Sequence, residues 1–175
     1  MLIRFNEWIT NALLVIAATL AFLLSFLVVA DVTGRVLFNS PVKGTPEIVS
    51  ISIVVICYLQ AAYAIRSGGM LRVDAFVSLL PRPAREALDV IGALLGAAFF
   101  GLILWGAYDP AVYSWTSDEF EGEGALRIPV WPARFIMLLG SALAILNYLL
   151  LAYQALLRML GKSAPPPPPP PEQAV

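Results

Sequence analysis

A basic connector at residues 64–85, AIRSGGMLRVDAFVSLLPRPAR, divides the chain into two apolar halves. The glycine pair at 68–69 breaks a helix, and the prolines at 81 and 83 stop one. Between these breaks, apolar residues recur at the helical spacing i, i+3, i+4 and i+7: Val73, Phe76, Val77 and Leu80. The spacing predicts a short amphipathic helix at about residues 72–80, lying flat in a membrane interface with Arg72 and Asp74 toward water.

The two halves are apolar enough to lie within a bilayer. Hydrophobic residues make up 59% of the 175 positions, more than a soluble domain of this size could bury. Four uncharged runs of 18 to 23 residues have the length that a helix needs to cross about 30 Å of hydrocarbon: Ile9–Ala30, Ile48–Ile65, Val90–Tyr108 and Phe135–Leu157. The sequence therefore predicts an all-α integral membrane protein with four transmembrane helices.

These helices are expected at about 9–36, 46–66, 84–108 and 132–158, within a single domain at 1–160. The first run could instead be a cleavable signal peptide ending at Val28-Val29-Ala30, but its 22 apolar residues exceed the usual 7 to 15. Residues 161–175 contain seven consecutive prolines, which predict a disordered or polyproline tail.

Charge asymmetry predicts the orientation. After four crossings the N-terminus, the connector and the C-terminus share one side, which holds seven cations: Arg4, Arg66, Arg72, Arg82, Arg85, Arg158 and Lys162. The other side has four, Arg35, Lys43, Arg127 and Arg134, with most of the acids. The positive-inside rule places both termini and the connector in the cytoplasm.

Several functional classes lack their usual residues. The chain contains no histidine and one cysteine, Cys57, so zinc, copper and haem sites are not expected and no cofactor is predicted. The four apolar runs carry no ionisable side chain of the kind that binds ions or protons at the bilayer midplane. A net charge of −1 gives no reason to expect a nucleic-acid partner. We therefore expect a non-catalytic scaffold or accessory subunit.

Candidate packing and interface residues lie along the helices. Asp31 and Arg35 are four apart and can pair on one helix face, and Thr45 is predicted to cap the second helix, which Pro46 opens. Glu47 favours the positive end of that helix, or pairs with Arg35 or a neighbouring subunit. Residues that suit close helix packing or an interhelical hydrogen bond are Gly92 and Gly96, and Gly140, Ala144 and Asn147.

The connection between the last two helices is acidic. It carries Asp118, Glu119, Glu121 and Glu123 around Phe120, without the ordered spacing of a calcium-binding loop. It is read as a solvated loop or as a docking surface for a soluble partner.

Four segments together resemble a known family: RVLFN at 35–39, GTPE at 44–47, AYAIRSGG at 62–69 followed by LRVD at 71–74, and IPVWP at 128–132. In order and spacing they are similar to the DctQ family, the small permease subunits of tripartite ATP-independent periplasmic (TRAP) transporters. The resemblance spans about Arg4 to Leu157. One departure is Leu71, because family members often carry a histidine at this position. An interfacial role of that histidine therefore does not carry over to this chain.

The resemblance implies a subunit of a bacterial inner-membrane uptake system for organic acids. A soluble periplasmic protein captures the solute, a larger membrane subunit moves it with a sodium gradient, and the small subunit scaffolds the larger one. On this basis Arg35 and Glu47 would stabilise the outer end of the first helix pair, and Arg66, Arg72 and Asp74 would fix the cytoplasmic corner. The four acids would help to dock the periplasmic protein.

The alternative is a membrane anchor subunit of a respiratory or redox complex, which the absence of histidine disfavours because such anchors normally hold haem through histidines. A small homo-oligomeric exporter using the Gly92 and Gly96 face is disfavoured by the missing midplane acid. Substrate specificity is expected to lie in the other two subunits.

Overall fold

The computed structural model of the 175-residue chain describes residues 2–67, 81–122 and 127–160. Their elements, in order, are α1 (Leu2–Phe38), α2 (Thr45–Arg66), α4 (Arg82–Thr116), β1 (Phe120–Glu121), β2 (Ile128–Pro129) and α5 (Trp131–Met159). The interfacial helix predicted at 72–80, the residues Arg72, Asp74 and Glu123, and the tail at 161–175 lie outside the described residues.

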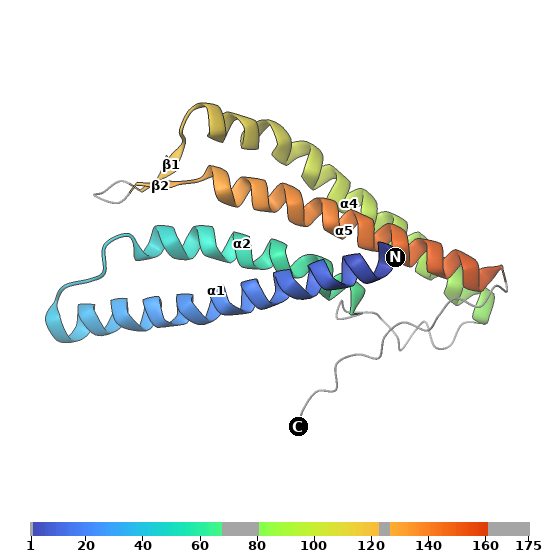
Figure 1. The fold of residues 1–175 in the computed structure, drawn as a ribbon, viewed down its shortest axis with the longest axis horizontal. Helices are drawn as coiled ribbons and strands as arrows, with labels where there is room; N and C mark the ends of the chain where they lie inside the picture. The colour runs from blue at the N-terminus through green and yellow to red at the C-terminus, as the bar shows by residue number, and fades with distance from the viewer. Residues whose placement is uncertain (1, 68–80, 123–126, 161–175) are drawn as a thin grey trace, which may run out of the picture.

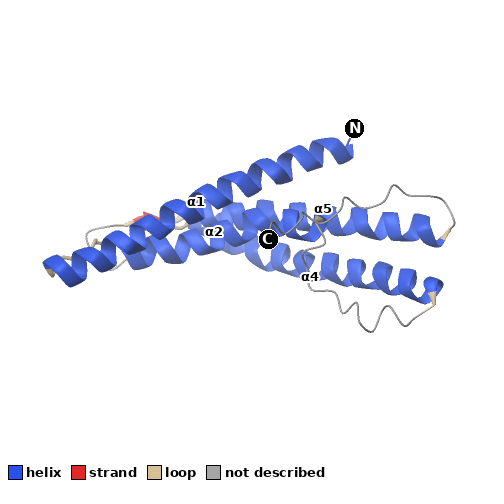
Figure 2. Cartoon of the chain, turned by 90° about the horizontal axis from the view of Figure 1, so that it is seen from below, coloured by secondary structure: helices blue, strands red, loops and turns tan. Residues whose placement is uncertain are grey.

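Among the described residues, four helices are long and apolar enough to cross a membrane, as predicted. They form two antiparallel hairpins, α1 with α2 and α4 with α5 (Figure 1). The main helix contacts run from α1 to α2, from α2 to α5 and from α5 to α4, so α5 joins the hairpins. Figure 2, seen from below, shows α1 crossing the other helices at an angle.

The two ends of this arrangement differ. The N-terminus, the end of α2, the beginning of α4 and the end of α5 lie toward one end, here called the terminal end (Figure 1). The α1–α2 turn and the β1–β2 hairpin lie at the other, the hairpin end. In β1–β2, Phe120 pairs with Pro129 and Glu121 with Ile128.

Small residues make the closest helix contacts. A Cβ atom on Gly140 of α5 would lie 2.5 Å from the backbone oxygen of Tyr58 in α2, so only glycine allows this approach. A Cβ atom on Gly96 of α4 would meet the Tyr148 ring at 2.6 Å, whereas one on Gly92 would meet nothing within 4 Å. Gly96 and Gly140 therefore lie at close contacts within the chain, whereas Gly92 faces open space. A role of Gly92 and Gly96 in contacts with another subunit stays a prediction.

A hydrophobic cluster lies where α2 and α4 both contact α5. Its buried members are Ile65, Phe100 and Ala144, one from each helix. Partly buried residues surround them: Tyr58, Ala61, Ile103, Ile145, Tyr148 and Leu151. Large apolar side chains elsewhere point outward, including Trp105 on α4, which is 85% exposed. The chain thus buries mostly small side chains and presents a broad apolar surface to its surroundings.

The third transmembrane helix was expected to end near residue 108, and this was wrong. α4 continues to Thr116 with Pro110 inside it. A proline removes one backbone hydrogen bond from the helix but keeps a helical φ. Packing of the residues that follow it offsets this loss. Ala111 and Ser114 are completely buried, and Trp115 meets Trp131 of α5 edge to face at 4.8 Å.

The predicted cap of the second helix also needs correction. The residue before the helix is Gly44, in the left-handed region at φ 83°, and the helix shows no side-chain cap. The Thr45 hydroxyl instead donates to the Val42 carbonyl at 3.0 Å, within the preceding turn. Glycine is favoured here because a side chain is strained at that φ.

The Gly140 contact yields a test of the fold. Gly140→Ala should lower the midpoint of thermal unfolding in detergent, at a cost of about 1–3 kcal/mol, because α2 and α5 must separate. Gly92→Ala is the matched control and should leave the midpoint unchanged or slightly higher, since alanine favours helices and has free space there. Equal midpoints for the two variants would contradict the close α2–α5 contact.

Candidate partner-binding surface

A buried pair of asparagines ties α1 to α5. The Asn6 Nδ2 group donates to Asn147 Oδ1 at 2.8 Å, and the two residues are 6% and 2% exposed. Asn147 Nδ2 in turn donates to the Leu143 carbonyl, and the Thr10 hydroxyl donates to the Asn6 carbonyl. The interhelical hydrogen bond predicted for Asn147 is confirmed, although its partner Asn6 was not foreseen.

Arg66 joins α2 to α1 at the terminal end. Its Nη1 lies 3.3 Å from Glu7 Oε1 and its Nη2 donates to Asn11 Oδ1 at 3.2 Å. The Nη1 contact lacks hydrogen-bond geometry, so the attraction to Glu7 is mainly Coulombic. At the same end, Arg158 of α5 lies 3.7 Å from Asp89 of α4. Ion pairs between neighbouring helices therefore hold both hairpins at this end.

Asp31 organises the α1–α2 turn. Its carboxylate is 6% exposed and accepts from Arg35 at 2.8 Å, as predicted, and from the Val42 backbone N–H at 2.9 Å. Arg35 is therefore paired with Asp31, and the Arg35–Glu47 pair that was considered does not form. One oxygen of Glu47, Oε2, is buried and accepts no hydrogen bond from the described residues.

The acidic connection is less uniform than its sequence suggests. Glu119 pairs with Arg134 of α5 at 2.9 Å, and Arg134 also donates to the Pro110 carbonyl at 2.8 Å. Glu121 is exposed and lies 3.5 Å from the Ser50 hydroxyl of α2, and Asp118 is exposed with φ 47°. Of the acids described in this connection, Glu119 is thus paired within the chain, whereas Asp118 and Glu121 are exposed.

Arg134 was missed as an organising residue. In the sequence it is one of four cations assigned to the outer side, and nothing nearby marks its partners. Its role depends on Glu119 and Pro110, which approach it only because α4 continues past residue 108. The signal that could have found it was a cation in the first turn of a helix whose next charged residue is Arg158, in its last turn.

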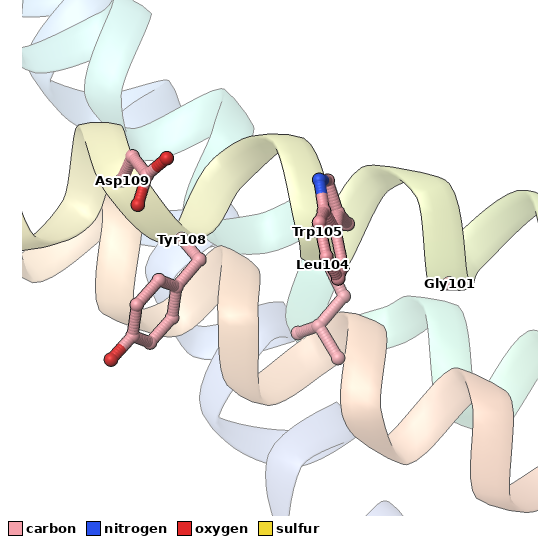
Figure 3. Close-up of a pocket in the computed structure, with 5 residues that line it drawn as sticks. All are labelled: Gly101, Leu104, Trp105, Tyr108 and Asp109. Atoms are coloured by element: carbon pink, nitrogen blue, oxygen red, sulfur yellow. The ribbon is translucent and has the colours of Figure 1, made fainter.

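Two hollows lie along α4, between Gly101 and Pro110. One, of about 490 Å³, is formed on α4 by Gly101, Leu104, Trp105, Tyr108 and Asp109 (Figure 3). The other, of about 540 Å³, lies among α2, α4 and α5. Its lining residues are Tyr58, Ile103, Gly106, Ala107, Pro110, Arg134 and Met137.

The described residues contain no group of three or more Cys, Asp or Glu side chains placed to hold a metal ion. What the geometry offers is a set of apolar surfaces between charged ends, which suits lateral contact with other membrane components.

Residues 24–158 match the family described as tripartite ATP-independent periplasmic transporters, DctQ component. This match covers more than half of the chain. The chain belongs to the DctQ family. Among curated proteins, it is 32% identical over 97 residues to the C4-dicarboxylate TRAP transporter small permease protein DctQ of Pseudomonas aeruginosa. That alignment covers 52% of this chain and 44% of the relative, so the chain spans less than half of the relative's length.

The family assignment agrees with the resemblance found in the sequence and with the four apolar helices. The matched region covers α2, α4 and nearly all of α5, together with the part of α1 from residue 24 onward. It therefore includes the Asp31 turn, the Gly140 contact and the Arg134 contacts, whereas Asn6, Glu7 and Asn11 precede it.

The free energy contributed by the Asn6–Asn147 hydrogen bond can be measured in this DctQ-family protein. Asn6→Ala and Asn147→Ala should each destabilise the chain, and a double-mutant cycle should give a coupling free energy of about 0.6–1.7 kcal/mol. Reversible unfolding in mixed detergent micelles provides the free energies.

The control cycle pairs Asn6→Ala with Ser141→Ala. Ser141 is fully buried, and its hydroxyl makes no hydrogen bond to the described residues. This cycle should give a coupling free energy near zero. A similar coupling in both cycles would mean that the asparagine bond contributes nothing specific.

Proposed function

We propose that the chain is the non-catalytic small permease subunit of a TRAP transporter and scaffolds a large permease subunit that carries out transport. The observation that carries the proposal is the combination of DctQ family membership with four apolar helices whose cores contain no ionisable residue. Transport of an ion or an organic acid requires groups that bind it within the membrane, and this chain supplies none there.

The arrangement of charges supports a scaffold. At the terminal end, Arg66 and Arg158 each contact an acid of a neighbouring helix, and at the hairpin end Arg134 links α5 to α4 and to Glu119. Contacts at both ends restrain the two hairpins, while large side chains such as Phe22, Leu102 and Trp105 remain exposed. A restrained frame with a broad apolar surface suits a subunit that holds a neighbour in place.

The remaining roles complete the proposal. The large subunit uses a sodium gradient, a periplasmic substrate-binding protein delivers an organic acid, and the complex lies in the bacterial inner membrane with both termini of this chain in the cytoplasm. The relative's name mentions C4-dicarboxylates, which makes this class the first to test. The exposed acids Asp118 and Glu121 then face the periplasm and help to dock the binding protein through its basic groups.

Reconstitution tests the scaffold role. An affinity-tagged chain should co-purify with a membrane protein of about a dozen helices when both are expressed from their natural genes. Proteoliposomes containing both proteins and the binding protein should take up labelled C4-dicarboxylate or another organic acid under a sodium gradient. The isolated chain should show only background uptake, because it lacks midplane binding groups. Robust uptake by the isolated chain would refute the proposal.

The same proteoliposomes test docking. Asp118→Asn with Glu121→Gln should raise the concentration of binding protein needed for half-maximal uptake, most clearly at low salt, where charges are least screened. Glu86→Gln, which removes an acid of α4 near the terminal end, is the charge-matched control for one substitution and should have no effect. An unchanged requirement in the double variant would show that these acids are only solvated.

Orientation has a separate test, using two serines that each follow the last residue of a helix. Ser67 caps the end of α2 and Ser117 the end of α4. In a Cys57→Ser background, a cysteine replacing Ser117 should react with a membrane-impermeant thiol reagent in spheroplasts, and one replacing Ser67 should react only after lysis. The reverse pattern would invert the topology.

A further inference from the structure

The cavity among α2, α4 and α5 is a groove built by three helices. Met137 and Arg134 of α5 lie in it together with Tyr58 of α2 and Ile103 and Pro110 of α4. A smaller adjoining cavity of about 190 Å³ shares Arg134 and Met137 and reaches Ser50, Val54 and Glu121. Together the two cavities run alongside α5, from Tyr58 of α2 to Glu121 in the β1–β2 hairpin.

The groove begins beside the hydrophobic cluster, and the adjoining cavity extends it toward the hairpin end. Tyr58 and Ile103 belong both to its lining and to the hydrophobic cluster around Phe100, where α2 and α4 meet over α5. Toward the hairpin end α4 stays in contact with α5, through the Arg134–Pro110 hydrogen bond and the Trp115–Trp131 ring contact. The groove thus has a fixed floor and walls, which the hollow on α4 alone does not have.

One wall of the groove exposes helix backbone. A Cβ atom on Gly106 would meet nothing within 4 Å, and the neighbouring lining residues of α4, Ala107 and Pro110, are small or lack a backbone N–H. In membranes, a helix wall without large side chains allows another helix to approach closely and gain van der Waals contact.

The adjoining cavity is lined by one acid, Glu121, and one base, Arg134. Arg134 is paired there with Glu119, and Glu121 lies across the smaller cavity beside Ser50. Because Arg134 is already paired, an occupant that supplies an N–H or a cation to Glu121 is favoured. An anionic phospholipid headgroup would be repelled.

We infer that this groove receives a transmembrane helix of the large permease subunit, with apolar side chains along the groove and a basic or amide donor beside Glu121. The inference rests on the proposed scaffold function and specifies the surface through which it acts. By contacting α2, α4 and α5 together, the partner helix would also hold the two hairpins at a fixed angle.

Three glycines of α4 allow a matched test. Gly92, Gly101 and Gly106 all lack neighbours within 4 Å of an added Cβ atom, so a side chain can start at any of them without a clash, and the thermal midpoint checks that leucine is accommodated. Only Gly106 lines the groove, while Gly101 lines the hollow on α4. Each tagged variant is expressed with the natural large subunit, and the amount of that subunit co-purified per chain is measured with the thermal midpoint of the isolated chain.

Gly106→Leu should reduce co-purification of the large subunit at least about tenfold, a ratio equal to about 1.4 kcal/mol, because the leucine fills the space needed by the partner helix. Gly92→Leu and Gly101→Leu should retain the wild-type ratio, and all three thermal midpoints should match that of the unmodified chain. This pattern would support the groove as the interface.

Other outcomes overturn the assignment. If Gly106→Leu co-purifies the large subunit as well as the unmodified chain does, the groove is excluded as the interface. If Gly101→Leu loses the large subunit as well, the interface lies at the hollow on α4. If Gly106→Leu keeps the large subunit but loses a co-purified phospholipid, the groove is a lipid site. Equal losses in all three variants would reflect general damage to α4 and remove the support for the groove. If the unmodified chain captures no large subunit, the scaffold function itself fails, independently of the groove.

Discussion

The close contact between α2 and α5 at Gly140 is the constraint on which the rest of the structure depends. Each hairpin is formed by helices that are neighbours in the sequence, but the two hairpins are joined mainly through α2 and α5. The approach of the Tyr58 backbone to Gly140 sets how near these helices lie and how they are rotated. That rotation places Ile65 against Ala144 and Phe100, and it leaves the groove open on the other side of Tyr58.

Polar contacts refine this arrangement because apolar helices gain little specificity from burial within a bilayer. Lipid tails are as apolar as leucine, so helix association depends on van der Waals packing and on hydrogen bonds between helices. The Asn6–Asn147 bond connects α1 to α5 across the hairpins, and Arg134 connects α5 to α4. Each fixes a rotation and a register that apolar side chains alone would leave less certain.

The surface that remains is consistent with a subunit whose neighbours complete its packing. The exposed backbone at Gly106 and the carboxylate of Glu121 are two features that a partner could complete. They lie in the two adjoining cavities that Arg134 also lines. In this proposal they share one explanation, since a partner helix would supply both the packing and the hydrogen-bond donors that the chain lacks.

The sequence by itself determined the membrane class, the four helices, the Asp31–Arg35 pair and the family resemblance. These follow from properties that add along the chain, such as the transfer of apolar side chains into hydrocarbon and the four-residue spacing of a helix face. The helix boundaries were less secure, because the buried contacts of Ala111 and Ser114 carry α4 past Pro110. Only the tertiary structure decided that Asn6 meets Asn147, that Arg134 meets Glu119, that Gly140 rather than Gly92 admits a neighbouring helix, and that a groove lies between the hairpins. The physical reason is that these features depend on helix order and rotation, and many rotations of an apolar helix bury similar amounts of surface, so the sequence pattern alone cannot choose among them.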